Sequence, residues 1–372
     1  MTPAPARVGD SVDAIDTPAL VVDLTAFEHN LARMAAFAAE AGIGLRPHAK
    51  THRCPAVALR QVAAGALGQC VQTVGEAEAM VAGGIGDVIC TNQILGPSKL
   101  DRLARLARTA RIGLLVDSQE GVERASQAAV AAGAEFDILV EIEVGMGRCG
   151  VAPGRPAAAL ARRVADAAGL RFRGLQAYNG RAQHIRSATG RRDAVARAAQ
   201  AVRETQAALA AEGLTAAVIG GAGTGTFRHE SAAGCWTEIQ VGSYVFMDRE
   251  YAELEDESGR RAPEFQHSLF VLAEIISTPS PGRAIANAGL KVLTTEQGRP
   301  LVFDHPDIEV TGVSDEHAVL TGPSGAALAL GQRLRLIPGH CDPTVNLHDW
   351  IVAVREGRVE EVWPVAARGA SR

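Results

Sequence analysis

Lys50 is the residue whose type most directly suggests chemistry in this chain. Only three of the 37 Lys and Arg residues are lysines: Lys50, Lys99 and Lys291. A guanidinium stays protonated in proteins, whereas an amine withdrawn from water can lose its proton and attack a carbonyl carbon. Lys50 ends a strand-like stretch, residues 44–50, and is a candidate for Schiff-base formation with an aldehyde such as pyridoxal phosphate. A surface lysine without a function is the alternative interpretation.

Further polar residues follow later strand-like segments. Arg148 lies in the segment 143–150, and Tyr178 and His184 lie in the segment 176–184. In a parallel barrel the active site forms at the carboxyl ends of the strands. A lone histidine or tyrosine at such a place usually packs in the core, but several at successive strand ends favour an active site.

Two glycine-rich turns are candidates for holding an anion, one at 220–226 and the other at 240–244. Glycine lets backbone N–H groups approach an anion closely, and barrels often bind phosphate after the seventh or eighth strand. No Gly-Lys-Ser/Thr follows, so this is not a nucleotide-binding P-loop. A glycine-rich turn alone is more often only a turn. The candidate phosphate ligands are Gly223, Thr224, Gly225, Gly242 and Ser243.

His340 and Asp342 form a candidate metal pair near the end of the chain. In an extended backbone two residues that are two apart project to one face, with Cys341 pointing away. Imidazole and carboxylate suit a divalent ion such as Mn²⁺ or Mg²⁺. Two protein ligands leave an open site that a substrate could complete. The alternative is a polar turn after a strand.

Short β-branched runs alternate with Ala-rich amphipathic stretches from residue 18 onward. About eight strand–helix units predict parallel strands with crossover helices, and the count favours a closed (β/α)₈ TIM-type barrel over an open sheet. The predicted strands are 19–24, 44–50, 69–73, 87–92, 112–117, 136–144, 172–178 and 217–221. The predicted helices are 25–41, 54–66, 75–83, 97–108, 119–132, 155–168 and 191–212.

After residue 250 the pattern changes to short β-rich segments separated by Gly, Pro or acidic turns. This predicts a barrel domain over 18–261, a linker near 253–261 and a C-terminal all-β domain over 262–372, with residues 1–17 as a further candidate to pair with it. The predicted strands of this domain are 269–276, 283–288, 290–295, 301–303, 318–320, 332–337 and 351–355.

Composition narrows the class of protein. The net charge is −5 and no basic run forms a patch, which argues against nucleic acid as a partner. No stretch approaches about 18 uncharged apolar residues, so we expect neither a signal peptide nor a membrane span. Six cysteines without CxxC spacing are expected to be reduced thiols in the cytoplasm.

Several of these segments occur in an order that resembles the D-threonine aldolase and D-serine dehydratase family, pyridoxal-phosphate enzymes with an alanine-racemase-like fold. The likeness spans nearly the whole chain, and the combination is specific although each segment alone is not. It implies a barrel, a C-terminal β domain, a divalent metal and a homodimer. The segments are 16–24, 46–52, 144–150, 220–225, 242–248 and 338–342.

The resemblance implies a role for each candidate. Lys50 would hold the cofactor, and the two glycine turns would bind its phosphate. Arg148 would contact the side of the ring that carries the hydroxyl, and Tyr178 would lie against the cofactor. His184 matches the proposed base of the aldolases. Asn179 departs from the family pattern, in which a histidine follows the tyrosine.

The metal pair discriminates within the family, because the aldolases resemble His-x-Asp and the dehydratases His-x-Cys. His340 and Asp342 therefore favour retro-aldol cleavage of a D-β-hydroxy-α-amino acid to glycine and an aldehyde. The alternatives are a dehydratase acting on D-serine or D-3-hydroxyaspartate, and a D-3-hydroxyaspartate aldolase. Two others belong to different classes: a non-catalytic barrel that carries pyridoxal phosphate, and a barrel that binds a sugar phosphate and pairs Lys50 with an acid.

Overall fold

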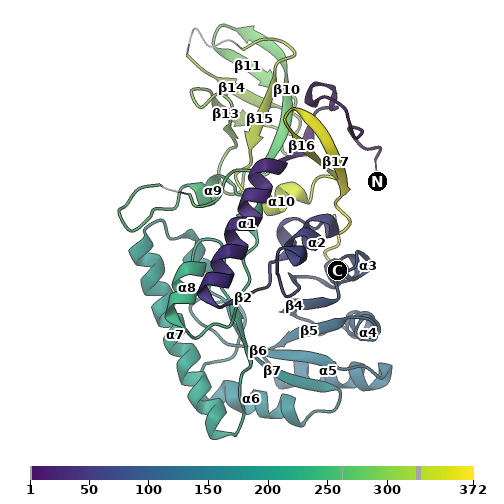
Figure 1. Cartoon of the computed structure of the whole chain (residues 1–372), viewed down its shortest axis with the longest axis vertical. Coiled ribbons are helices and arrows are strands. Elements are labelled where there is room, and N and C mark those ends of the chain that lie inside the picture. Colours follow the sequence, from purple (N-terminus) through teal and green to yellow (C-terminus); the bar gives the residue numbers. More distant parts are fainter. Residues whose placement is uncertain (1, 262, 324–327) are drawn as a thin grey trace.

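The computed structural model describes residues 2–261, 263–323 and 328–372. These residues form an eight-stranded sheet and a nine-stranded sheet. Figure 1 shows the eight-stranded sheet with its surrounding helices in the lower half, the other sheet above it, and helix α1 running between the two. No helix in the described ranges is long and apolar enough to cross a membrane.

Ten α-helices and four 3₁₀-helices occur within the described residues. The α-helices are α1 (Leu24–Ala41), α2 (Pro55–Ala63), α3 (Val74–Ala82), α4 (Pro97–Leu106), α5 (Gln119–Ala132), α6 (Arg155–Asp166), α7 (Ala188–Ala211), α8 (Phe227–Ala233), α9 (Arg249–Ala252) and α10 (Cys341–Val345). The 3₁₀-helices are η1 (Val12–Ala14), η2 (Ala49–Thr51), η3 (Gly180–His184) and η4 (Ser243–Val245).

The strands fall into two groups along the chain. The eight-stranded sheet contains β2 (Gly44–Leu45), β3 (Gln69–Val71), β4 (Asp87–Gln93), β5 (Arg111–Val116), β6 (Phe136–Glu141), β7 (Leu170–Ala177), β8 (Val218–Gly221) and β9 (Glu238–Ile239). The nine-stranded sheet contains β1 (Ala19–Asp23), β10 (Leu269–Ser280), β11 (Arg283–Ala286), β12 (Leu301–Val302), β13 (Glu309–Val313), β14 (Ala318–Thr321), β15 (Arg333–Ile337), β16 (Trp350–Arg355) and β17 (Arg358–Pro364).

The eight-stranded sheet is a closed parallel barrel. Its strand order is β2-β9-β8-β7-β6-β5-β4-β3, and all neighbours are parallel. The two ends of this order meet because His48 and Cys70 form a parallel bridge, in which Cys70 N–H donates to the Pro47 carbonyl at 2.8 Å. The predicted barrel fold is therefore confirmed, and the open sheet is excluded.

One strand of the prediction belongs elsewhere. Residues 19–24 are not the first barrel strand, because β1 pairs antiparallel with β10 and parallel with β16 in the other sheet. The barrel takes β9 as its eighth strand instead, a two-residue strand too short to show a pattern. Both faces of β1 are buried, so its sequence alone carries no sign of which sheet it joins.

The second sheet is β-rich as predicted, with differences in detail. Residues 290–295 form no strand, and β13 and β17 were not predicted. Part of the leading segment does pair with this sheet, since Gly9 N–H donates to Val359 O at 2.8 Å and Val359 N–H to Asp10 O at 2.9 Å. The division into two domains at 18–261 and 262–372 stays a prediction, except that β1 pairs with the second sheet and not with the barrel.

Helix α1 has clear end signals in the sequence and buries one face between the two sheets. The Asp23 carboxylate caps the helix by accepting bonds from Thr25 N–H at 3.0 Å and Ala26 N–H at 3.1 Å. The helix ends at Gly42, whose φ of +62° suits glycine. Phe27 and Met34 are fully buried in a core that also holds residues of both sheets. This shared core fixes the second sheet over one side of the barrel.

Candidate active site

Lys50 lies in helix η2, directly after the short strand β2. The strand predicted over 44–50 is wrong beyond residue 45, because the chain turns into a 3₁₀-helix that His48 caps by accepting a bond from Lys50 N–H at 3.3 Å. The Lys50 side chain still reaches a cavity of about 220 Å³ at the carboxyl ends of the barrel strands. The Lys50 amine therefore lies at this end of the barrel, although the backbone that carries it is helical and not a strand.

The Lys50 amine forms an ion pair with the carboxylate of Asp342, which lies on α10 outside the barrel. Burial alone would lower the pKa of the amine, but this carboxylate raises it above its ordinary value. Burial would likewise raise the pKa of Asp342, yet the amine holds it well below its usual range. The candidate cofactor lysine and one residue of the candidate metal pair therefore lie in direct contact.

Arg53 joins the two helices that carry this pair. Its guanidinium donates to the Asn346 side chain at 2.6 Å, at the end of α10, and pairs with Glu76 of α3 at 3.0 Å. Because Arg53 comes two residues after η2, it connects η2 with α10. The position of Asp342 relative to Lys50 is therefore set by this additional contact between barrel and second sheet.

His340 and Asp342 approach one another as predicted, but not through an extended chain. His340 occupies the N-cap position of α10 without a capping bond from its side chain, and Asp342 lies in the first turn, with His340 Nε2 at 3.8 Å from Asp342 Oδ1. His340 Nδ1 contacts Glu296 Oε2 at 2.8 Å, so Nε2 is the ring nitrogen directed at Asp342. Among the described residues no cluster of three or more His, Cys, Asp or Glu could hold a metal.

His48 is locked in a neutral form on the cavity wall. Its Nδ1 accepts from Lys50 N–H, so Nε2 carries the proton and donates to Thr91 Oγ1 at 3.0 Å. The Thr91 hydroxyl in turn donates to the Val71 carbonyl at 3.1 Å. Burial and the nearby Lys50 charge lower the pKa of His48 to about 3. Both ring nitrogens are engaged, so His48 shapes the cavity rather than exchanging protons.

Arg148 and Tyr178 meet on another wall of the same cavity. The Arg148 guanidinium lies 5.9 Å from the centre of the Tyr178 ring and 3.7 Å from the Glu141 carboxylate. Burial raises the pKa of the Tyr178 hydroxyl, so the phenol is neutral. A flat aromatic wall beside a guanidinium suits a planar ligand that carries an anionic or hydrogen-bond-accepting group at its edge.

The two glycine turns lie side by side at the cavity. Gly223, Thr224, Gly242 and Ser243 border it, whereas Gly225 faces away from it. Tyr244 N–H donates to Thr224 Oγ1 at 3.0 Å, which ties the two turns together. A Cβ atom at Gly242 would lie 2.5 Å from Thr51 Oγ1, so only glycine fits there.

His184 ends helix η3 at the mouth of the cavity. Its Nδ1 contacts the Glu250 carboxylate on α9, which leaves Nε2 without a partner in the described chain. Glu250 and Glu296 were not predicted as functional residues. Folding brings Glu250 to His184 and Glu296 to His340, and neither glutamate belongs to a sequence motif that would have indicated this.

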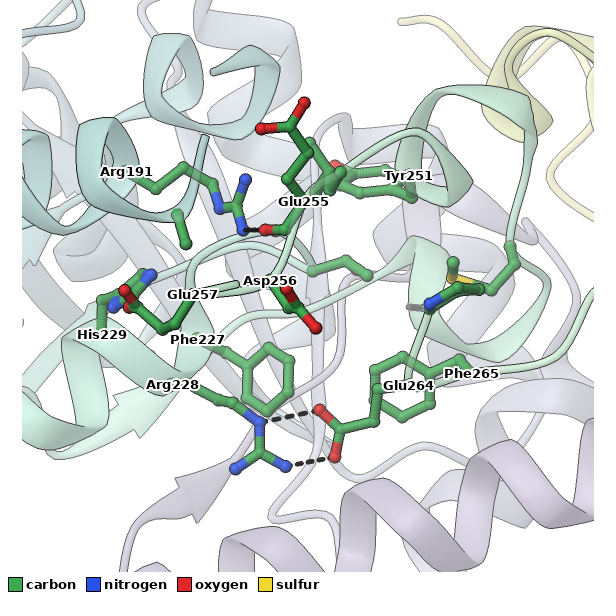
Figure 2. Close-up of a pocket in the computed structure, with 16 residues that line it drawn as sticks. Arg191, Phe227, Arg228, His229, Tyr251, Glu255, Asp256, Glu257, Glu264 and Phe265 are labelled. Atoms are coloured by element: carbon green, nitrogen blue, oxygen red, sulfur yellow. Dashed lines mark hydrogen bonds and ion pairs between the residues drawn. The ribbon is translucent and has the colours of Figure 1, made fainter. Parts of the chain in front are cut away.

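A second cavity, of about 400 Å³, lies behind the first glycine turn. Figure 2 shows that its charged side chains engage nearby groups: Arg228 pairs with Glu264, and Arg191 donates to the Glu255 carbonyl at 2.7 Å. Thr224 borders both cavities, so the glycine turn forms part of the wall between them.

Comparison with known proteins assigns the family. Residues 22–250 match the family described as "Alanine racemase, N-terminal domain", and residues 268–354 match the "Putative serine dehydratase domain". A D-threonine aldolase of Arthrobacter sp. is 47% identical over 371 residues, which cover 100% of this chain and 97% of that protein. The chain belongs to this family of alanine-racemase-like enzymes. The predicted family is therefore confirmed.

Other members of the alanine-racemase-like family support the assignment. A 3-hydroxy-D-aspartate aldolase of Paracoccus denitrificans (strain Pd 1222) is 42% identical, with 98% of this chain and 95% of that protein aligned. The crystal structure of D-threonine aldolase from Filomicrobium marinum superposes with a TM-score of 0.97 at 47% identity, covering 99% of this chain and 100% of the other. The likeness thus includes both the barrel and the second sheet.

Proposed function

We propose that this protein cleaves D-threonine and related D-β-hydroxy-α-amino acids to glycine and an aldehyde, using pyridoxal phosphate and a divalent cation. The observation that carries the proposal is the meeting of the Lys50 amine with Asp342, 292 residues away in sequence. One place thereby holds an amine for the cofactor and a carboxylate for a cation. The aldolase relatives at 47% and 42% identity give the reaction class.

The residues present fit pyridoxal phosphate. Lys50 offers the amine that would hold it, and Tyr178 with Arg148 would flank its ring. Hydroxyls and backbone N–H groups of Thr224 and Ser243 would bind its phosphate, because the glycines beside them leave room for close approach. When bound, the cofactor supplies an electron sink for the electron pair left on Cα.

The donor set also fits a divalent cation. His340 Nε2 and a carboxylate oxygen of Asp342 face each other, and Glu296 fixes the histidine from its other nitrogen. A cation there would lower the pKa of the substrate hydroxyl. Only two protein donors are offered, so substrate or water must complete the shell. Mn²⁺ is the proposed ion, with Mg²⁺ as the alternative.

His184 is the proposed proton acceptor, and a comparison of histidines supports this choice. His48 has both nitrogens engaged. His52 is fully buried, and burial lowers its pKa to about 4. His184 lines the cavity and is oriented by Glu250 through one nitrogen, so the other can receive a proton. Glu250 would also stabilise the imidazolium that results.

The β-hydroxyl proton goes to His184, the C–O bond becomes a carbonyl, and the Cα–Cβ bond breaks with its electron pair remaining on Cα. Water then supplies a proton to Cα, which gives glycine, and the protonated His184 releases its proton to water. The D preference comes from the resemblance and the relatives, since side-chain types carry no handedness.

Incubation of the purified protein with D-threonine tests the proposal. Acetaldehyde and glycine in equal amounts support the aldolase, whereas 2-oxobutanoate and ammonia would assign the chain to the dehydratases. If activity survives complete chelation of metal ions, the reaction does not require a cation. A protein with no absorbance near about 420 nm would contradict pyridoxal phosphate altogether, and a spectrum unchanged in Lys50→Ala would show another anchor.

A second candidate activity is cleavage of D-3-hydroxyaspartate to glyoxylate and glycine. Arg181 lines the cavity and forms no ion pair with any carboxylate of the described residues. An unpaired guanidinium could bind the extra carboxylate of this substrate. A kcat/KM higher for D-3-hydroxyaspartate than for D-threonine, and lost in Arg181→Met, would favour this activity. The homodimer and the cytoplasmic location stay predictions from the sequence.

A further inference from the structure

The first glycine turn is bordered by open space on two sides. Gly223 and Thr224 border the cavity that contains Lys50, and Thr224 and Gly225 border the second cavity. Close packing of side chains therefore cannot by itself hold the turn in one shape. Hydrogen bonds to its backbone must do so if the turn is to bind a phosphate group without first reorganising.

A chain of three buried side chains reaches the turn from behind. Gln183 Oε1 accepts from Gly225 N–H at 2.9 Å, and Gln183 Nε2 donates to Thr226 Oγ1 at 2.7 Å. The Thr226 hydroxyl donates to Glu230 Oε1 at 2.8 Å. Gln183, Thr226 and Glu230 are 2%, 1% and 2% exposed. Water therefore cannot replace these bonds if one partner is removed.

The Glu230 carboxyl sets the direction of this chain of bonds. Thr226 has one hydroxyl hydrogen and gives it to Glu230, so its oxygen is left to accept from the Gln183 amide. The Gln183 amide is thereby oriented with its carbonyl oxygen toward the turn. The other Glu230 oxygen, Oε2, is buried with no partner among the described residues, a cost that the folded protein carries.

Gln183 also touches the turn sterically. A Cβ atom at Gly223 would lie 2.5 Å from Gln183 Oε1, so the amide packs directly against the turn. Gln183 is the neighbour of His184 in η3. One side chain therefore fixes both the shape of the turn and its position relative to the proposed proton acceptor.

We propose that Gln183, Thr226 and Glu230 are positioning residues that hold the first glycine turn ready for the phosphate of the cofactor. The inference rests on the proposed function, which assigns the phosphate to this turn. None of the three lines the cavity that contains Lys50, so they can affect a ligand there only through the turn or through neighbouring residues. Removing their hydrogen bonds should therefore weaken binding of the cofactor phosphate, whereas the loss of a merely structural polar cluster would lower only the stability of the folded protein.

Thr226→Val and Thr226→Ser form the matched test pair. Valine keeps the shape but removes the hydroxyl, which leaves the Gln183 amide only its longer bond to the Asn179 carbonyl at 3.4 Å, and serine keeps the hydroxyl. The cofactor is removed from the full-length protein, and binding of pyridoxal phosphate and of pyridoxal is then titrated by visible absorbance. Pyridoxal lacks the phosphate, so its affinity reports the other contacts of the site.

Thr226→Val is expected to raise the dissociation constant of pyridoxal phosphate about tenfold and that of pyridoxal less than about twofold, from the loss of one buried hydrogen bond. Thr226→Ser should match the wild type for both ligands. Equal weakening for both ligands, or no weakening, would overturn the positioning role. Wild-type protein that binds no pyridoxal phosphate would instead refute the proposed function itself.

A second variant covers the case in which Thr226→Val does not fold. Gln183→Met removes the amide bonds to Gly225, Thr226 and Asn179 while leaving the bond between Thr226 and Glu230 intact. It should show the same selective loss of pyridoxal phosphate affinity. Circular dichroism would show whether the Gln183→Met protein is folded. If a folded Gln183→Met protein kept the wild-type ratio of pyridoxal phosphate affinity to pyridoxal affinity, the inference would be contradicted.

Discussion

The Glu230→Gln substitution should raise the free energy of unfolding relative to the wild type, by an amount that grows between pH 4.5 and 7. Glu230 is buried, and burial raises the pKa of its carboxyl from 4.5 to about 7. Glutamine keeps an oxygen that can accept the Thr226 hydroxyl but never ionises. The substitution therefore removes the cost of a buried charge and keeps the hydrogen bond, while the amide N–H groups replace an oxygen that also has no partner among the described residues, a cost that does not change with pH.

The size and sign of the effect follow from proton linkage. Between pH 4.5 and 7 the folded protein keeps the Glu230 proton and the unfolded chain loses it, so the free energy of unfolding falls as pH rises. A gap of about 2.5 between the two pKa values corresponds to about 3 kcal/mol. The difference between variant and wild type should grow by about this amount across that window and stay constant above it.

Chemical denaturation of cofactor-free protein at a series of pH values from about 5 to 8 measures this difference. Other groups with raised pKa, such as Asp248 at about 6, contribute to both proteins and cancel in the comparison. Glu257→Gln, on an exposed side chain, serves as the control and should give a flat difference. A flat difference for Glu230→Gln as well would refute the argument, because it would mean that the carboxyl titrates normally when buried.

Three further variants test other parts of the site and fold. Lys50→Arg should fold but lose the absorbance of bound pyridoxal phosphate near about 420 nm, since guanidinium forms no carbon–nitrogen double bond with the aldehyde. Arg46→Met should lower the free energy of unfolding by roughly 3–5 kcal/mol in chemical denaturation, because Glu238 stays buried without its partner at 2.7 Å. Glu296→Gln should weaken Mn²⁺ binding about 10–100-fold in magnetic resonance titrations, because His340 loses its orienting carboxylate.

Each of these three has a matched control outside the contact concerned. Lys99→Arg should keep the absorbance, Arg163→Met on an exposed face of α6 should change stability little, and Glu316→Gln should leave Mn²⁺ binding unchanged. Retained absorbance in the Lys50 variant would mean that another residue holds the cofactor. A loss below about 1 kcal/mol for the Arg46 variant would mean that water reaches Glu238. Unaltered Mn²⁺ affinity would show that Glu296 does not orient a metal ligand.

Local sequence determined the barrel and most of its helices. The alternation of β-branched runs with amphipathic stretches is a property of neighbouring residues, so strands such as β4 to β7 and helices such as α5 could be placed without a structure. Lys50 could be singled out because the chemistry of an amine belongs to the residue type. The roles of the predicted site residues are still proposals.

Tertiary structure alone decided how the parts meet. Strand β1 has the same apolar character as a barrel strand, and only its partners β10 and β16 place it in the other sheet. The ion pair of Lys50 with Asp342, and the contacts of His184 with Glu250 and of Glu296 with His340, join residues 44 to 292 positions apart. No local pattern records such pairs, because they follow from packing the second sheet against the barrel through the shared core around α1.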